Sequence, residues 1–196
     1  MKGKKKIAAL ILAGIMCVSL TGCGIVTIVP KGQEALFTGE EETDISASSA
    51  DDWTLVVEEI TENAEDLATV AADADSSTTY SVSFTGTVSE YNTDSPKGYL
   101  LVEVDGVDDE VHIQVGSVYS GTTIRDSQTL RAFQDFENQT EWSEYGSALN
   151  DEVQTNVVDA NGIGDDTVGS TITVVGCYKP SSDGVITVTP VSITVE

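Results

Sequence analysis

The sequence predicts a mainly β domain with helices, of the α+β class, built around a five-stranded barrel like that of the OB-fold. Three observations support this prediction. Five short segments alternate apolar and polar residues, as half-buried strands do. Two longer segments repeat apolar residues at spacings of three and four, as amphipathic helices do. One of these helices falls between the third and fourth strands, which is the element order of that barrel.

The N-terminal amphipathic helix is predicted over residues 51–75. Its apolar stripe consists of Trp53, Val56, Ile60, Ala64, Leu67 and Val70. Asp51 or Asp52 is placed to accept hydrogen bonds from the free N–H groups of the first turn. Because an apolar stripe must be covered, we expect the helix to pack on the barrel domain, residues 76–196, with coiled-coil association as the alternative.

Three strands follow a polar stretch. Their alternating positions are Tyr80, Val82, Phe84, Gly86 and Val88 in the first, Leu100, Val102 and Val104 in the second, and Val111, Ile113 and Val115 in the third. The turn signals "NTDSPKG" end the first strand, and the Asp-Gly pair of "DGVDDE" indicates a hairpin between the second and third.

The last two strands are "TITVVGCY" and "GVITVTPVSITVE". In the final strand the inward residues are Ile186 and Val188 before Pro190, then Val191, Ile193 and Val195 after it. The inward phase therefore shifts by one residue at Pro190, which has no N–H to donate. Both features predict a β-bulge at the proline.

A connection of roughly fifty residues separates the third and fourth strands, and a bare loop of that length is unusual in a compact domain. Apolar residues recur within it at helical spacing: Phe136, Trp142, Tyr145, Leu149, Val153 and Val157. They predict a long helix from about Asn138 to Val158.

The N-terminus predicts export and a lipid anchor. Residues 1–22 have the layout of a secretory signal peptide, with four lysines ahead of the apolar run 7–20. The tetrapeptide "LTGC", ending at Cys23, resembles the bacterial lipobox, in which acyl chains such as palmitate are attached through the cysteine and the chain is cut before it. We expect anchoring through Cys23 on the extracytoplasmic face of the cell membrane, periplasmic or at the cell surface, with residues 23–50 as a flexible tether.

Charge and cysteine content exclude several kinds of partner and site. The chain has a formal net charge of −24, and without residues 1–22 five basic residues would face 33 acidic ones, a charge of −28. Nucleic-acid binding needs clustered Lys and Arg, so we expect none. With Cys17 removed and Cys23 lipidated, Cys177 stands alone beside a single histidine. We therefore expect no disulfide, no cofactor and no metal site built from nitrogen and sulfur ligands, whereas cations that bind oxygen stay open.

One stretch, residues 111–153, resembles the signature of a family of predicted periplasmic lipoproteins, domain of unknown function 2291. The matching residues are Gly116, Gly121, Thr122, Arg125, Asp126, Phe133, Asp135, Phe136, Asn138, Gln139, Leu149 and Asn150. The lipobox, the helix near Trp53 and the closing "ITVTPVSITV" correspond as well. The resemblance implies no known activity. Members tend to be encoded beside sugar import systems of the ribose ABC type, which implies transporter components as partners.

Six polar residues of that stretch form a candidate binding or structural cluster: Arg125, Asp126, Asp135, Asn138, Gln139 and Asn150. They could converge at one rim of the barrel, where the guanidinium of Arg125 would suit a carboxylate or sugar hydroxyls. On the structural interpretation, Arg125 pairs with Asp126 or Asp135, Asp135 caps the long helix, and the two asparagines hold loop backbone. Both interpretations stay open.

Other candidate sites carry weaker signals. His112 alternates with inward valine and isoleucine, so its side chain should point outward from the third strand, and no nucleophile can be nominated beside it. The acidic turns lack the spacing of a calcium loop, so we interpret them as solvated. The leading hypothesis is a non-catalytic binding or accessory module. The alternative is a hydrolase of cell-envelope glycans that uses paired carboxylates.

Overall fold

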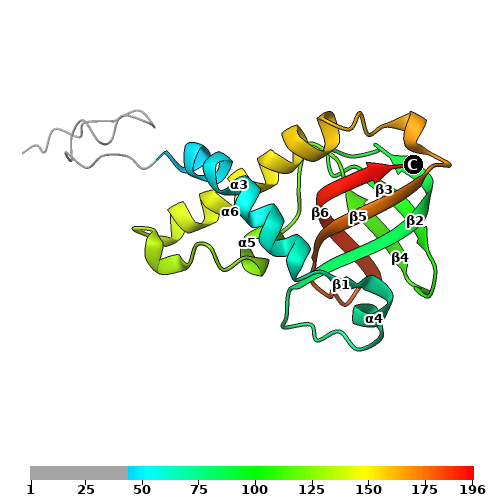
Figure 1. Ribbon diagram of the computed structural model, residues 1–196, viewed down its shortest axis with the longest axis horizontal. Helices are drawn as coiled ribbons and strands as arrows, with labels where there is room; N and C mark the ends of the chain where they lie inside the picture. The colour runs from blue at the N-terminus through cyan, green and yellow to red at the C-terminus, as the bar shows by residue number, and fades with distance from the viewer. Residues whose placement is uncertain (1–43) are drawn as a thin grey trace, which may run out of the picture. The chain divides into compact units, whose positions relative to one another are not determined.

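The computed structural model describes residues 44–196 as one compact unit (Figure 1). The signal segment 1–22, the lipidation site Cys23 and most of the tether lie outside the described residues. Their assignments therefore stay predictions from the sequence.

Five strands close into a barrel. They are β2 (Tyr80–Asn92), β3 (Tyr99–Val104), β4 (Glu110–Gln114), β5 (Thr171–Tyr178) and β6 (Val185–Val195). The order is β2-β3-β4-β6-β5, and β2 also pairs with β5, which closes the sheet. All pairs in this ring are antiparallel except β4–β6. This arrangement, with its helix between the third and fourth barrel strands, confirms the predicted OB-fold-like barrel.

The predicted bulge at Pro190 is present. Gly176 of β5 pairs with Pro190, and the preceding Val175 pairs with Ser192, so Val191 is the extra residue of β6. Val191 is buried beside Pro190, which explains the shift in the inward phase. The prediction that Val195 points inward is wrong: it is 40% exposed, because β6 ends there at the rim of the barrel.

The N-terminal helical region differs from its prediction in its ends. Helix α3 spans Ile45–Glu62, so residues 45–50, assigned to the tether, are helical. Asp44 caps it by accepting from the Ala47 N–H at 3.0 Å, and the predicted cap Asp52 lies buried inside the helix. The predicted single helix over 51–75 is interrupted by the short strand β1 (Glu65–Asp66), which pairs in parallel with β2. Asp66 then caps α4 (Leu67–Ala72), and this second cap explains the break.

The long connection between β4 and β5 is mostly helical. It contains α5 (Thr123–Ser127), the single turn η1 (Phe133–Asp135), α6 (Gln139–Val153), the π-helical turn η2 (Gln154–Asp159) and η3 (Asp165–Thr167). Asn138 caps α6 by accepting from the N–H groups of Thr140 and Glu141. The helix predicted from about Asn138 to Val158 thus corresponds to α6 followed by η2.

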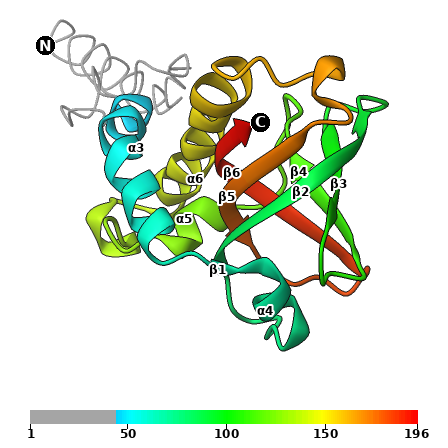
Figure 2. The same cartoon turned by 45° about the vertical axis from the view of Figure 1, so that its right-hand side comes forward.

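Three helices cover one side of the barrel, and strands β3 and β4 lie outside the covered side (Figure 2). Helices α3, α5 and α6 pack against β2, β5 and β6, burying Val56, Ile60, Tyr145 and Leu149 against the barrel core. The apolar stripe of α3 is therefore covered within the chain. Strands β3 and β4 lie on the side away from these three helices (Figures 1 and 2).

Candidate functional site

The loop after β4 is pinned to the barrel by two glycines. Gly116 lies so close to the β2–β3 turn that an added Cβ would stand 2.2 Å from the Gly98 nitrogen. The N–H groups of Val115 and Gly116 both donate to the Gly98 carbonyl, at 3.0 and 2.9 Å. Further along, Gly121 adopts φ 80°, a conformation that side chains disfavour. Gly116 therefore allows a close approach of two backbone segments, and Gly121 allows a positive φ.

Gln114 fastens the same loop. Its side chain is buried and accepts from the Ser120 N–H at 2.7 Å, while its amide donates to the Ser120 carbonyl and to the Thr189 hydroxyl, at 3.3 and 2.7 Å. This role of Gln114 was not predictable from the sequence, because Gln114 lies in the outward phase of β4, between two inward residues. It is buried because the loop folds back over that end of the barrel.

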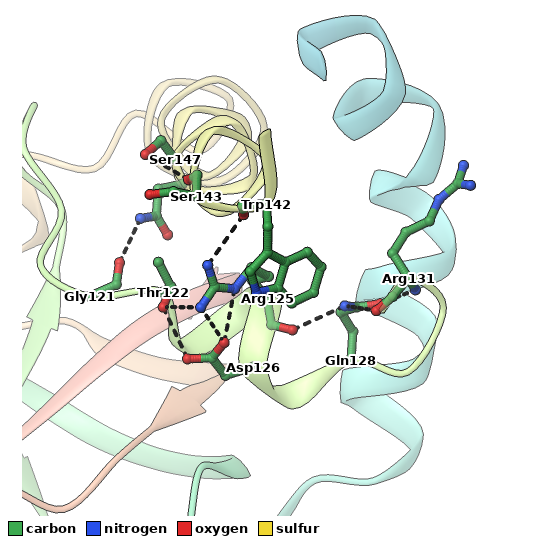
Figure 3. A network of polar contacts seen from close by, with 10 residues as sticks. Gly121, Thr122, Arg125, Asp126, Gln128, Arg131, Trp142, Ser143 and Ser147 are labelled. Atoms are coloured by element: carbon green, nitrogen blue, oxygen red, sulfur yellow. Dashed lines mark hydrogen bonds and ion pairs between the residues drawn. The ribbon is translucent and has the colours of Figure 1, made fainter. Parts of the chain in front are cut away.

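Arg125, on α5, is held by four hydrogen bonds within the chain (Figure 3). Its Nε and Nη2 groups donate to Asp126 Oδ1 at 2.9 and 2.7 Å. Nη2 also donates to the Thr122 hydroxyl at 3.0 Å, and Nη1 donates to the Trp142 carbonyl at 3.2 Å. The guanidinium carbon lies 4.6 Å from the centre of the Trp142 ring, a cation–π contact. Four of its five N–H groups thus have partners.

A second ion pair links α3 to the connection. Arg131 donates from Nε and Nη2 to the two carboxylate oxygens of Asp52, at 2.7 and 3.0 Å. The buried Tyr145 hydroxyl donates to the same carboxylate at 3.1 Å. Burial raises the pKa of Tyr145, and the neighbouring Asp52 charge raises it further. Sequence reasoning missed this cluster, since its three members come from segments far apart in the chain.

Gln128 connects the two ion pairs. Its amide donates to the carbonyls of Arg125 and Arg131, at 3.0 and 2.8 Å, and its oxygen accepts from the Arg131 N–H at 2.7 Å (Figure 3). The segment between α5 and η1 is thereby fixed at both ends. We call the group Asp52, Thr122, Arg125, Asp126, Gln128, Arg131, Trp142 and Tyr145 the helical joint.

The six predicted cluster residues divide into two groups. Arg125 pairs with Asp126 and not with Asp135, and Asn150 donates to the Gly121 carbonyl at 3.0 Å. Asp135 accepts from the Ala132 N–H at 2.8 Å, so it caps η1 and not the long helix.

Asn138 and Gln139 form the beginning of α6, where Asn138 is the cap and Gln139 is exposed. Within residues 44–196, Arg125 shares no hydrogen bond with Asp135, Asn138 or Gln139. Direct hydrogen bonds therefore do not join the six residues into one network around Arg125.

His112 lies on the outer face of β4, as its alternation predicts. Its ring stacks on Tyr99 with centroids 3.8 Å apart and planes 6° from parallel. Its Nε2 lies 3.4 Å from Glu110 Oε2, and its side chain is 18% exposed.

Two further features concern metal and thiol chemistry. In the part of the chain from residue 44 onward, no three His, Cys, Asp or Glu side chains are grouped to hold a metal ion. Burial raises the pKa of the Cys177 thiol to about 12. A buried thiol with so high a pKa is unreactive at neutral pH.

Residues 44–196 contain no helix with the length and apolar character needed to cross a membrane.

Comparisons with known proteins agree with the fold and identify a family. The model of the family described as predicted periplasmic lipoprotein, DUF2291, matches residues 13–194. A crystal structure of an OB-fold protein from Thermotoga maritima superposes with a TM-score of 0.61 at 16% sequence identity, covering 80% of this chain and 100% of that chain. At this identity the likeness concerns the fold alone. No curated protein matches the sequence.

Proposed function

We propose that this chain, which belongs to the DUF2291 family of predicted periplasmic lipoproteins, is a non-catalytic binding or accessory module attached to the membrane through Cys23. Membrane anchoring on the extracytoplasmic side follows from the family. The attachment residue and the absence of catalysis are our proposals. A tether before Asp44 would hold the barrel domain near the membrane surface.

The observation that carries this proposal is that four of the five N–H groups of Arg125 are hydrogen-bonded within the chain. Ligand-binding and catalytic arginines need free N–H groups, and here four of the five donate to Asp126, Thr122 and Trp142. The polar residues of the signature stretch thus hold the connection together. Their geometry favours a structural role and leaves binding to another surface.

The alternative, a carboxylate-dependent hydrolase acting on cell-envelope glycans, is less well supported. A general acid needs a raised pKa, usually through burial. Asp75 and Asp183 instead have lowered pKa values, because the nearby hydroxyls of Ser77 and Ser181 donate hydrogen bonds to them. Among residues 44–196 the most buried carboxylate is that of Asp52, and it already accepts hydrogen bonds from Arg131 and Tyr145.

The proposal is tested by separating anchoring, accessory function and catalysis. A deletion strain should take up less ribose, the type of sugar that the family resemblance implies, and the wild-type gene should restore uptake. Cys23→Ser should leave the membrane fraction and fail to restore uptake. The purified lipoprotein should release no reducing ends from cell-envelope glycans.

Two results would contradict it. Quantitative sedimentation of Cys23→Ser with membranes would place the anchor elsewhere. Glycan cleavage that is abolished by a single Asp or Glu substitution would establish the hydrolase instead.

A further inference from the structure

The outer face of β3 and β4 carries a stacked pair of aromatic rings. In the β3–β4 register, Leu101 pairs with His112 and Tyr99 pairs with Gln114, so Tyr99, Leu101 and His112 share one face. Leu100 and Ile113, which alternate with them, are fully buried in the barrel. Tyr99, Leu101 and His112 are each partly exposed. We call this region the outer barrel face.

Acceptor groups surround the rings. Glu110 Oε2 lies 3.4 Å from His112 Nε2. Glu90 is the register partner of Leu101, so it stands on the same face of the sheet as Tyr99. Burial raises the pKa of Tyr99, and the charges of Glu90, Glu110 and Asp94 raise it further. Asn92 pairs with Tyr99 in the β2–β3 register and donates to Glu90 at 2.9 Å.

This face corresponds to the binding surface of OB-fold barrels. Such barrels bind oligonucleotides or oligosaccharides on their second and third strands, between the first and fourth inter-strand loops. Those strands are β3 and β4 here, and the loops are residues 93–98 and 179–184. Helices α3, α5 and α6 lie on the other side of the barrel (Figure 2). The loop held by Gln114 borders the face, because Gln114 is the register partner of Tyr99.

Charge decides between the two ligand classes. Residues 44–196 hold four of the nine basic and 29 of the 33 acidic side chains. Two of the four basic residues, Arg125 and Arg131, are already in ion pairs. A nucleic-acid strand needs a basic groove, so this surface would repel it. A neutral sugar needs an apolar ring surface for its C–H groups and acceptors for its hydroxyls, and both are present.

We propose that the outer barrel face, centred on Tyr99 and His112, binds a neutral carbohydrate. One side of a sugar ring packs against the aromatic pair, and its hydroxyls donate to Glu90, Glu110 or Asp94. This inference deepens the proposed function and rests on it, because it names the ligand class of a module that binds without catalysis.

The single histidine of the chain makes the test direct. The full-length lipoprotein, labelled with ¹³C-histidine, is purified in lauryldimethylamine oxide, a detergent without a sugar head group. Ribose, maltotetraose, xylotetraose and chitotetraose are titrated in turn, and the imidazole resonances of His112 are followed. At least one sugar should shift them saturably, with a Kd of roughly 0.1–5 mM, as a small open site would give.

Variants separate this site from the rest of the molecule. Calorimetry should show about tenfold weaker binding for Tyr99→Ala and for Tyr99→Leu, because both lose the ring face. Tyr99→Leu keeps an apolar side chain of similar size on the strand, so it can test the loss of the aromatic ring if Tyr99→Ala does not fold. Phe133→Ala is the matched control, an exposed aromatic on η1, and should bind the sugar normally.

Each contrary outcome has a distinct meaning. No shift of His112 with any of the sugars at about 20 mM, well above the expected Kd, would overturn the site. Binding that survives both Tyr99 variants would do the same, and so would a single-stranded oligonucleotide that shifts His112 more than the sugars do. Cleavage of the bound sugar would overturn the non-catalytic function and leave the site standing.

Discussion

The helical joint and the outer barrel face use similar polar residues in opposite ways. In the joint, Arg125 and Arg131 direct their donors to Asp126, Thr122, Trp142 and Asp52. On the outer face, Glu110 lies beside His112 and Glu90 accepts from Asn92, and within residues 44–196 neither carboxylate is paired with an arginine. Groups that satisfy one another hold a fold together, whereas unneutralised acceptors beside an exposed ring can still bind a ligand. The family signature therefore marks the joint, and the proposed binding surface lies on the other side of the barrel (Figure 2).

This contrast predicts that the joint carries stability and the outer face carries binding. Substitutions in the joint should lower the melting temperature and leave sugar affinity unchanged. Substitutions on the face should do the reverse.

The largest effect is expected for Arg131→Ala. The substitution leaves the carboxylate of Asp52, whose side chain is only 8% exposed, without its positively charged partner. It should lower the free energy of unfolding by about 3 kcal/mol. Urea denaturation measures this change. The double variant Asp52→Asn with Arg131→Ala should recover part of the loss, because a neutral amide replaces the stranded charge. A double variant less stable than Arg131→Ala would show that the buried charge is not the cause.

Arg125→Ala should cost less, about 2 kcal/mol, because the side chain of its partner Asp126 is 35% exposed and water can solvate the carboxylate left behind. For a domain of this size the melting temperature should fall by about 4–8 °C. Arg125→Lys should recover little, since an ammonium group cannot reproduce the fork of donors. A variant that melts like the wild type but binds sugar poorly would assign Arg125 to the ligand site.

Asn138→Ala removes the cap of α6 and should cost about 1 kcal/mol. Asn138→Asp is the matched control, because it keeps an acceptor at the cap and should restore stability. Thermal melts of the three proteins measure the difference. An unchanged melting temperature for Asn138→Ala would mean that water replaces the cap without loss.

The features that were predictable from the sequence are those that local patterns encode. Alternation located all five barrel strands, and the phase shift at Pro190 located the bulge beside Val191. The ends of α3 were missed because the acid-rich segment offers several possible caps, and Asp44 and Asp66 are distinguished only by the backbone around them. Neither composition nor spacing indicates which aspartate caps the helix.

Contacts between distant segments explain the rest. Asp52 meets Arg131 and Tyr145 across 79 and 93 positions, so no local pattern predicts that cluster. The outward direction of His112 was predictable from alternation. Its stack on Tyr99 depends on the register of β3 against β4, which pairs Leu101 with His112 and thereby brings Tyr99 diagonally opposite the histidine.

The smallest effect on stability is expected on the outer barrel face. His112→Ala removes one ring of a stack that is partly open to water, so the free energy of unfolding should fall by only about 0.5 kcal/mol. A double-mutant cycle with Tyr99→Ala should give a coupling energy of similar size, measured by urea denaturation. A coupling above about 2 kcal/mol would mean that the stack supports the barrel as the joint does. A small coupling, together with weaker sugar binding in both single variants, is the result that a ligand-binding face requires, because the binding energy of the rings is realised only when a ligand covers them.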